Sequence, residues 1–222
     1  MNIVAIVASP NGLNGYTGML VKPMIEAAQG TKADIQIVSF DTLTVNCCKG
    51  CTKICHTTGR CFQNDDDFNM ILAAMLSADG IIFATPNYCF NVSAQMKALL
   101  DRCNFPLHCG SFQGKYCATV VTSGGSDNEV VEKYLYSILT QFGFRIAGSV
   151  NAVQFALQDP DMLAELEKEA AALGLRLVHA IEKQEVYPVQ EEERERGLQV
   201  MEFLVETMKQ EWPLAYEYRQ KN

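Results

Sequence analysis

The chain opens with the apolar run Ile3-Val4-Ala5-Ile6-Val7-Ala8, which passes directly into the polar run Ser9-Pro10-Asn11-Gly12-Leu13-Asn14-Gly15-Tyr16-Thr17. A strand that is apolar on both faces is typical of the centre of a parallel sheet covered by helices. The polar run leads into a helix-like pattern, so its hydroxyls and backbone N–H groups lie at a helix N-terminus, where the dipole favours a phosphate. Its glycines do not follow the G-x-G-x-x-G dinucleotide pattern, and no Walker lysine follows. The run is therefore an ordinary strand-to-helix turn or, if neighbouring strand ends supply a wall for a ring, a mononucleotide site.

Four more strand-like runs follow, separated by helix-like segments; they cover residues 35–40, 80–85, 115–121 and 144–155. This alternation predicts an α/β fold with a doubly wound, five-stranded parallel sheet. The pattern after residue 159 is helical, and no repeat or Pro-, Gly- or Ser-rich linker divides the chain. We therefore expect one domain over residues 1–185 and a helical extension over residues 186–222 that packs on it.

Composition excludes several classes of function. The net charge of −8 and the pI near 4.9 argue against nucleic-acid binding, which needs a basic surface. No apolar run reaches the roughly 18 residues of a membrane span, and the first strand has no basic leader before it. The nine cysteines, an odd number, suggest thiols or metal ligands in a reducing compartment rather than a disulfide framework. We expect a cytoplasmic protein that binds neither nucleic acid nor membrane.

Two later strand ends carry chemistry that matches the first loop. They are Thr85-Pro86-Asn87-Tyr88-Cys89-Phe90-Asn91 and Thr122-Ser123-Gly124-Gly125-Ser126. In an open parallel sheet, ligands bind beyond the carboxyl ends of the strands. A proline-stiffened turn with an aromatic residue and a glycine turn would let backbone approach a flat ring. A phosphate at one strand end and a planar heterocycle at two others fits FMN better than ATP or NAD.

A cysteine-rich loop spans residues 45–64. Cys48, Cys51, Cys55 and Cys61 have the spacing C-x2-C-x3-C-x5-C, with Cys47 directly before them. Four thiolates in one loop could ligate a 4Fe–4S cluster, bind zinc, or form a metal-free set of thiols. Zinc is the least favoured, because structural zinc sites usually pair two separated C-x2-C knuckles. The run Asp65-Asp66-Asp67 that follows is expected to cap the next helix.

Taken together, these segments are similar to a known family. The matching residues are the first loop through Thr17, then Thr85 to Tyr88 continuing through Ser93, Lys97 and Asp101-Arg102, and Cys48 to Cys61 followed by Asp65-Asp66. Over roughly residues 1–150 the chain resembles the flavodoxin-like NAD(P)H-dependent FMN reductases, and more narrowly their iron–sulfur flavoprotein branch. Two positions depart from the family pattern: Asn11 stands where many relatives carry a basic residue, and one extra residue precedes Cys55.

The resemblance implies a flavodoxin-like fold and specific roles for the three loops. The residues expected to hold the FMN phosphate are Ser9, Asn11, Asn14, Gly15, Tyr16 and Thr17. Those expected to contact the isoalloxazine are Pro86, Asn87, Tyr88 and Cys89 on one side, and Ser123, Gly124 and Gly125 on the other. The metal ligands would be Cys48, Cys51, Cys55 and Cys61. Because the flavin carries the chemistry, no catalytic side chain is expected, and the three histidines are expected to be solvated or structural.

The leading functional expectation is an FMN-dependent oxidoreductase that takes hydride from NADH or NADPH. Its acceptor would be a flavin, quinone or nitroaromatic or, through an iron–sulfur cluster, a protein. One alternative is an iron–sulfur flavoprotein that carries electrons to or from a ferredoxin, with no nicotinamide substrate. Another is a flavin-free interaction module with a zinc-bound loop. The resemblance also implies a homodimer or homotetramer.

Overall fold

The computed structural model describes residues 1–221. Its centre is a sheet with the strand order β2-β1-β3-β5-β6, all neighbours parallel, and a short strand β4 that pairs antiparallel with the end of β3. The strands are β1 (Asn2–Val7), β2 (Asp34–Ser39), β3 (Gly80–Tyr88), β4 (Asn91–Val92), β5 (Tyr116–Ser123) and β6 (Arg145–Val153). The predicted five-stranded parallel sheet of a flavodoxin-like fold is confirmed, and β4 is an addition that the sequence did not predict.

The first strand explains why helices must cover both faces of the sheet. Alternate residues of β1 belong to two separate hydrophobic cores: Val4 and Ile6 to one, Ala5 and Val7 to the other. All four are at most 2% exposed. The strand can therefore be stable only when both of its faces are packed against other elements.

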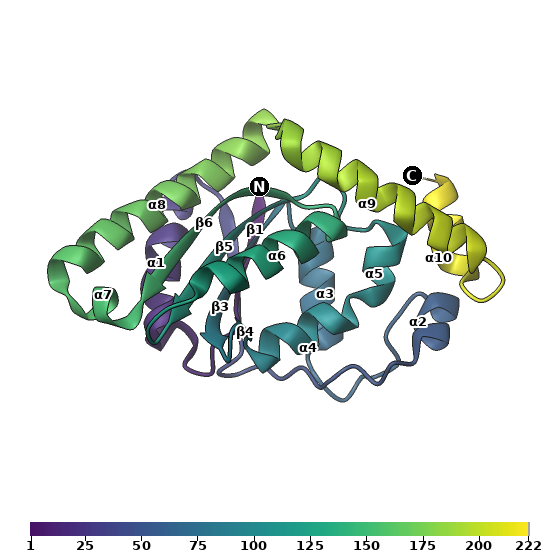
Figure 1. Cartoon of the computed structure of the whole chain (residues 1–222), viewed down its shortest axis with the longest axis horizontal. Helices are drawn as coiled ribbons and strands as arrows, with labels where there is room; N and C mark the ends of the chain where they lie inside the picture. Colours follow the sequence, from purple (N-terminus) through teal and green to yellow (C-terminus); the bar gives the residue numbers. More distant parts are fainter. Residues whose placement is uncertain (222) are drawn as a thin grey trace.

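Helices cover the two faces as this pattern requires (Figure 1). One face packs against α1 (Tyr16–Gln29) and α8 (Pro160–Lys183), with α7 (Gln154–Gln158) between β6 and α8. The other packs against α3 (Phe68–Ser77), α4 (Ala94–Arg102) and α6 (Asn128–Phe142). A short helix α5 (Asn104–Cys109) follows α4 directly. The sheet is thus the middle of three layers, and its strand ends point at a common edge.

The segment between β2 and α3 differs from the predicted loop in two ways. It contains a short helix α2 (Thr52–Thr58), which ends at Gly59 in a left-handed conformation (φ 71°). Asp67 is the N-cap residue of α3, but in the described residues its side chain accepts no hydrogen bond from the helix; only Asp66 accepts one there, from the Phe68 N–H at 3.2 Å. The same carboxylates bind the preceding loop: Asp67 accepts a hydrogen bond from the Thr44 N–H at 2.8 Å, and Asp66 accepts one from the Asn46 N–H at 2.7 Å. The capping prediction is therefore wrong for the side chain of Asp67, because that carboxylate, like Asp66, binds the start of the cysteine loop instead.

The extension consists of α9 (Pro188–Thr207) and α10 (Pro213–Lys221), and residue 222 of the predicted segment lies outside the described part of the chain. α9 packs along α6, and Gln190 exchanges two hydrogen bonds with the backbone of Ile146 on the edge strand β6. α10 reaches across to α2 and α5, so residues far apart in sequence lie side by side (Figure 1). Within residues 1–221, no helix has the length and apolar character needed to cross a bilayer.

Candidate functional site

Three loops meet at the carboxyl edge of the sheet, because β1, β3 and β5 are neighbours. Ser93 joins two of these strand ends: its hydroxyl donates to the Ala8 carbonyl at 2.6 Å, and its backbone N–H donates to Thr85 Oγ1 at 3.0 Å. A buried hydrogen bond of 2.8 Å between Thr17 and Thr122 joins the first loop to the end of β5. We call the loops 9–17, 86–89 and 123–125 together the strand edge.

The first loop presents a helix N-terminus without a side-chain cap. Gly15 is the N-cap residue of α1, and in the described structure no side chain accepts a hydrogen bond from the first turn. The leading N–H groups of a helix have no partner within the helix, so they are available to an anion. Ser9 is 3% exposed, and its Oγ accepts from the Asn11 N–H at 3.3 Å. Asn14 and Tyr16 are exposed beside them.

The second loop is a tight hairpin between β3 and β4. Asn87 pairs with Val92 and Tyr88 with Asn91, which leaves Cys89 and Phe90 at the tip with φ values of 52° and 62°. Two successive positive φ values are the geometry of a two-residue hairpin turn, and non-glycine residues adopt it only at an energetic cost. The turn exposes two aromatic side chains, Tyr88 and Phe90, at the strand edge.

In the third loop, the backbone of two glycines is uncovered, and it lies next to a serine hydroxyl that has no hydrogen-bond partner in the described residues. Among residues 1–221, apart from each glycine and its two chain neighbours, no heavy atom lies within 4 Å of the position that a Cβ would take on Gly124 or Gly125. Ser123 Oγ is buried and has no hydrogen-bond partner in the same part of the chain. Asn87 Nδ2 donates to the carbonyls of Ser126 and Asp127 at 3.3 and 3.2 Å, which ties this loop to the second one. The strand edge therefore fits a ligand with an anionic group and a flat polar ring.

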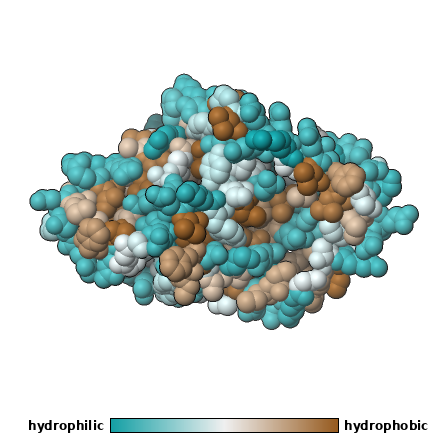
Figure 2. All heavy atoms as spheres, viewed as in Figure 1, coloured by the Kyte–Doolittle hydropathy of each residue, from teal (hydrophilic) through white to brown (hydrophobic). Residues whose placement is uncertain are grey.

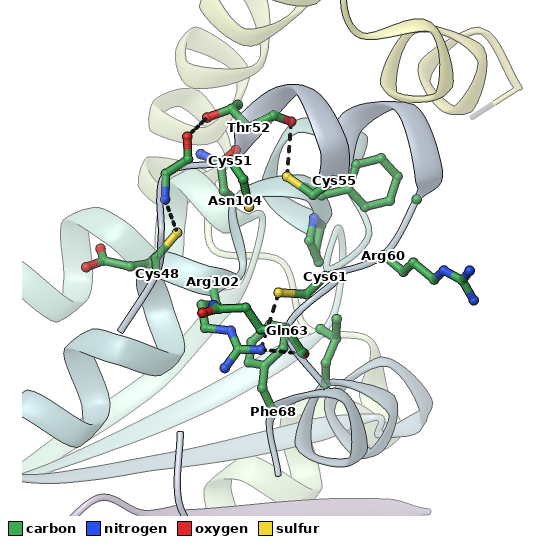
Figure 3. Close-up of a pocket in the computed structure, with 16 residues that line it drawn as sticks. Cys48, Cys51, Thr52, Cys55, Arg60, Cys61, Gln63, Phe68, Arg102 and Asn104 are labelled. Carbon is green, nitrogen blue, oxygen red and sulfur yellow. Dashed lines mark hydrogen bonds between the residues drawn. The ribbon is translucent and has the colours of Figure 1, made fainter. Parts of the chain in front are cut away.

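The four predicted ligand cysteines line a second feature, a cavity of about 330 Å³ that we call the cysteine cavity. Cys48 precedes α2, Cys51 is its N-cap residue, Cys55 lies in its middle and Cys61 follows it. Figure 3 shows the four labelled sulfur-bearing side chains around this cavity, with Arg60 turned away from it. Cys47 is exposed and is not part of the described lining.

The sulfurs surround a space rather than one point. No three Cys, His, Asp or Glu side chains of residues 1–221 are placed to hold a single metal ion. A tetrahedral zinc ion needs sulfurs about 2.3 Å away, whereas in a four-iron cluster each thiolate binds a different iron and the ligands stand further apart. What the cavity supplies is the donor chemistry of such a group, because four thiols lie on its wall.

Burial and neighbouring sulfurs keep one of these thiols protonated when no metal is bound. Desolvation, with repulsion from Cys51 and Cys61 thiolates, raises the pKa of Cys55 to about 11. Its Sγ donates to the Thr52 carbonyl at 3.2 Å. A bound cation reverses this preference, because coordination deprotonates a thiol outright. Metal binding here would thus release protons.

A buried cation also lies on the cavity wall. Arg102, at the end of α4, donates from Nη2 to Cys61 Sγ at 3.3 Å and forms an ion pair with Asp66 in which both side chains are at most 1% exposed. Burial alone would raise the pKa of Asp66, but hydrogen bonds from the Asn46 N–H and Arg102 outweigh it and lower the pKa. In the sequence, Arg102 stood out only as part of a family motif. Its contact with Cys61, 41 positions away, could not be predicted from any local pattern.

The C-terminal extension supports the back of α2. His56 is fully buried and stacks on Trp212 with ring centroids 4.3 Å apart, and its Nε2 bonds Asn104 Oδ1 at 2.9 Å. Desolvation lowers the pKa of His56 to about 4, so the ring is neutral near pH 7. His56 and His108 are both buried and fit the predicted structural role. No local pattern in the sequence indicates that Trp212 lies against α2.

Comparison with known proteins identifies the family of the chain. Residues 1–158 match the family model for NADPH-dependent FMN reductases. An iron–sulfur flavoprotein of Archaeoglobus fulgidus is 30% identical over 183 residues, covering 82% of this chain and 81% of that protein. The crystal structure of an NADH:FMN oxidoreductase in its apo form superposes with a TM-score of 0.58 at 23% identity over 78% of this chain and 88% of that one.

A FMN-dependent NADH-azoreductase of Bacillus anthracis, solved in complex with FMN, has a TM-score of 0.61 at 17% identity and covers 79% of this chain and 98% of its own. These two structures support the fold alone. The family model and the sequence relative also support membership of a family, because they extend over most of the chain. The chain therefore belongs to the NADPH-dependent FMN reductase family of flavin-dependent oxidoreductases, in its iron–sulfur flavoprotein branch.

Proposed function

We propose that the strand edge binds FMN, with its phosphate at the first loop and its ring between the second and third. The residues assigned to the phosphate are Ser9, Asn11, Asn14, Gly15, Tyr16 and Thr17. Those assigned to the ring are Pro86, Asn87, Tyr88 and Cys89, with Ser123, Gly124 and Gly125 opposite. The observation that carries this assignment is the uncapped N-terminus of α1 beside the unpaired Ser123 hydroxyl, joined through the Thr17–Thr122 hydrogen bond. Free N–H donors suit the phosphate, and a free hydroxyl suits a ring heteroatom.

We further propose that NADH or NADPH reduces the bound flavin, and that a small flavin, quinone or nitroaromatic compound accepts the electrons. The flavin supplies hydride and single-electron chemistry. The protein's part is to hold the ring at the open backbone of Gly124 and Gly125 and to leave room for the nicotinamide. The exposed rings of Tyr88 and Phe90 offer apolar surface on which a planar substrate can stack.

The cysteine cavity is proposed to hold a 4Fe–4S cluster on Cys48, Cys51, Cys55 and Cys61. Support comes from the cavity volume, from four sulfurs on its wall and from the Arg102 donor to Cys61. The iron–sulfur relative named above agrees with this assignment. Such a cluster would connect the flavin with a protein electron acceptor.

A second candidate is an electron carrier that exchanges electrons with a ferredoxin and does not use nicotinamide. The cysteine cavity favours it, because a reductase of small molecules needs no second redox centre. We also propose that the chain forms a homodimer or homotetramer. Exposed apolar residues on α9, among them Val200 and Phe203, offer a surface for it, and Figure 2 shows hydrophobic atoms along that helix.

One set of measurements on anaerobically purified protein tests these assignments. FMN, iron and sulfide are quantified per chain, the oligomer is sized by light scattering, and flavin reduction by NADH, NADPH and reduced ferredoxin is followed at the flavin absorbance. We expect one FMN and four irons, and reduction by a nicotinamide. Reduction by ferredoxin alone would replace the first function with the second. Zinc without iron would contradict the cluster, and protein without FMN would contradict the strand-edge site.

A further inference from the structure

The buried guanidinium on the wall of the cysteine cavity has a role that its ion pair alone does not explain. Resting on the cluster proposed above, we propose that Arg102 is a positioning residue that sets the reduction potential of that cluster through Cys61. It does so by donating a hydrogen bond to the Cys61 sulfur and by holding a positive charge on the cavity wall.

The donors of Arg102 are divided between two sides. On one side Nη1 pairs with the Asp66 carboxylate; on the other, Nη2 donates to Cys61 Sγ at 3.3 Å and to the Gln63 carbonyl at 3.0 Å. The guanidinium carbon Cζ lies over the ring of Phe68, 4.1 Å from its centroid. Figure 3 shows the guanidinium directed at the Cys61 sulfur. The side chain is therefore locked with one donor aimed at a candidate ligand.

The ion pair is arranged asymmetrically about the cavity. Arg102 lines the cavity, whereas Asp66 is absent from the described lining and accepts instead from the N–H groups of Asn46 and Phe68. The positive member thus faces the cysteines, and the negative member faces the backbone behind it. Because both side chains are withdrawn from water, salt screens their field weakly.

This arrangement favours the reduced state of a cluster. Reduction by one electron adds one negative charge among the four thiolates, and hydrogen bonds to sulfur together with local net charge set the potential of such centres. A donor on Cys61 and the facing guanidinium stabilise that added charge. Asp66 opposes this effect from further away. The two members of one ion pair should therefore move the potential in opposite directions.

A purely structural role makes a different prediction. Removing either member of a buried ion pair leaves the other charge unpaired and destabilises the fold. Stability would then fall in both variants, and any disturbance of the cluster would be alike. A loss of stability is expected under either role and cannot distinguish them. The sign of the shift in cluster potential can, because only an electrostatic role predicts opposite shifts for the two variants.

The test compares Arg102→Gln with Asp66→Asn in the full-length protein loaded with FMN and iron. The cluster potential is measured by redox titration followed by electron paramagnetic resonance, and unfolding is measured in parallel. We expect a more negative potential for Arg102→Gln, a more positive one for Asp66→Asn, and a loss of thermal stability in both. Arg102→Lys keeps the charge but lacks the planar fork, so its potential should lie between those of the wild type and Arg102→Gln.

The outcomes distinguish this inference from the function on which it rests. Wild-type protein without iron and sulfide overturns both proposals. Iron-loaded variants whose potentials are unchanged, or shift in the same direction, overturn the role of Arg102 and leave the cluster assignment standing. If one single variant does not fold, the neutral pair Asp66→Asn with Arg102→Gln is compared with the single variant that does. The potential of the pair must be more negative than that of Asp66→Asn, or more positive than that of Arg102→Gln; otherwise the inference fails.

Discussion

At the strand edge, loops are joined by backbone and hydroxyl groups that neighbouring parallel strands bring together, as in the Ser93 contacts with Ala8 and Thr85. At the cysteine cavity, one loop is held by side chains from distant elements: Arg102 from α4 in front and Trp212 from the extension behind. The strand edge is assembled by the order of the strands in the sheet, whereas the cysteine cavity depends on contacts with side chains from distant elements. Disturbance of the extension should therefore affect the cavity and spare the strand edge.

The largest expected effect is the loss of iron from the cysteine cavity without any loss of FMN from the strand edge. Cys61→Ser should abolish iron binding, because an alcohol replaces a thiolate ligand, while FMN content stays at the wild-type level. Cys47→Ser is the matched control and should retain iron, since Cys47 lies outside the described lining. Iron, sulfide and FMN analysis checks both. Retained iron in Cys61→Ser, or lost iron in Cys47→Ser, would show that the ligand set is different.

Gly15→Val should have the opposite effect: it should weaken FMN binding and leave iron binding intact. A Cβ on Gly15 would lie 2.8 Å from Asn11 Cβ and 3.5 Å from Ser9 Oγ, so a branched side chain must displace the phosphate loop. We expect FMN affinity to fall at least about tenfold, or ~1.4 kcal/mol, with iron content unchanged. Fluorescence titration of FMN measures the change, and Gly30→Ala at the far end of α1 is the control. Unaltered affinity would move the phosphate site elsewhere.

A smaller effect should come from Trp212→Ala. Truncation of a buried tryptophan costs about 3 kcal/mol, and here it also removes the stacking partner of His56. Thermal unfolding should shift downward and iron should be lost faster to a chelator, with FMN binding retained. Leu175→Ala, at a 47% exposed position on α8, should leave both unchanged. Parallel loss of FMN and iron would mean that the strand edge also depends on the extension.

The smallest expected effect is a pH dependence of the metal-free protein. Burial lowers the pKa of His56 to about 4 and also lowers the pKa of His108. The unfolded chain therefore binds more protons between about pH 6.5 and pH 4, so stability is complete above this window and falls as pH decreases through it. Urea unfolding at pH 7.5 and pH 5 measures the change. A His56→Gln variant should lose part of this dependence.

The same contrast explains what the sequence could predict. The sheet was predictable because a run of consecutive apolar residues, such as residues 3–8, indicates a strand that is buried on both faces. The hairpin of β4 was not, since Cys89 and Phe90 occupy positive φ values where Asn-Gly or Asp-Gly would have signalled a turn. α2 was missed because its threonines are weak helix formers and its stability comes from packing on α10.

The capping prediction for Asp65 to Asp67 shows the same limit. Acidic residues before a helix are a local signal, but the partners of Asp66, namely Asn46 and Arg102, lie 20 and 36 positions away. Local patterns identify an acidic helix start and a cysteine cluster separately. Only the folded chain brings Asp66, Arg102 and Cys61 into one network.

The contact between α10 and α2 also bears on biosynthesis. On a ribosome, Cys48 to Cys61 emerge long before residues 213–221, so the nascent cysteine loop lacks the Trp212 stack and its support from behind. A chain caught at this stage has four thiols on a short, weakly helical segment. Delivery of iron should therefore succeed only after synthesis has passed α10, and a chain truncated before Trp212 should accumulate as a yellow, iron-free protein.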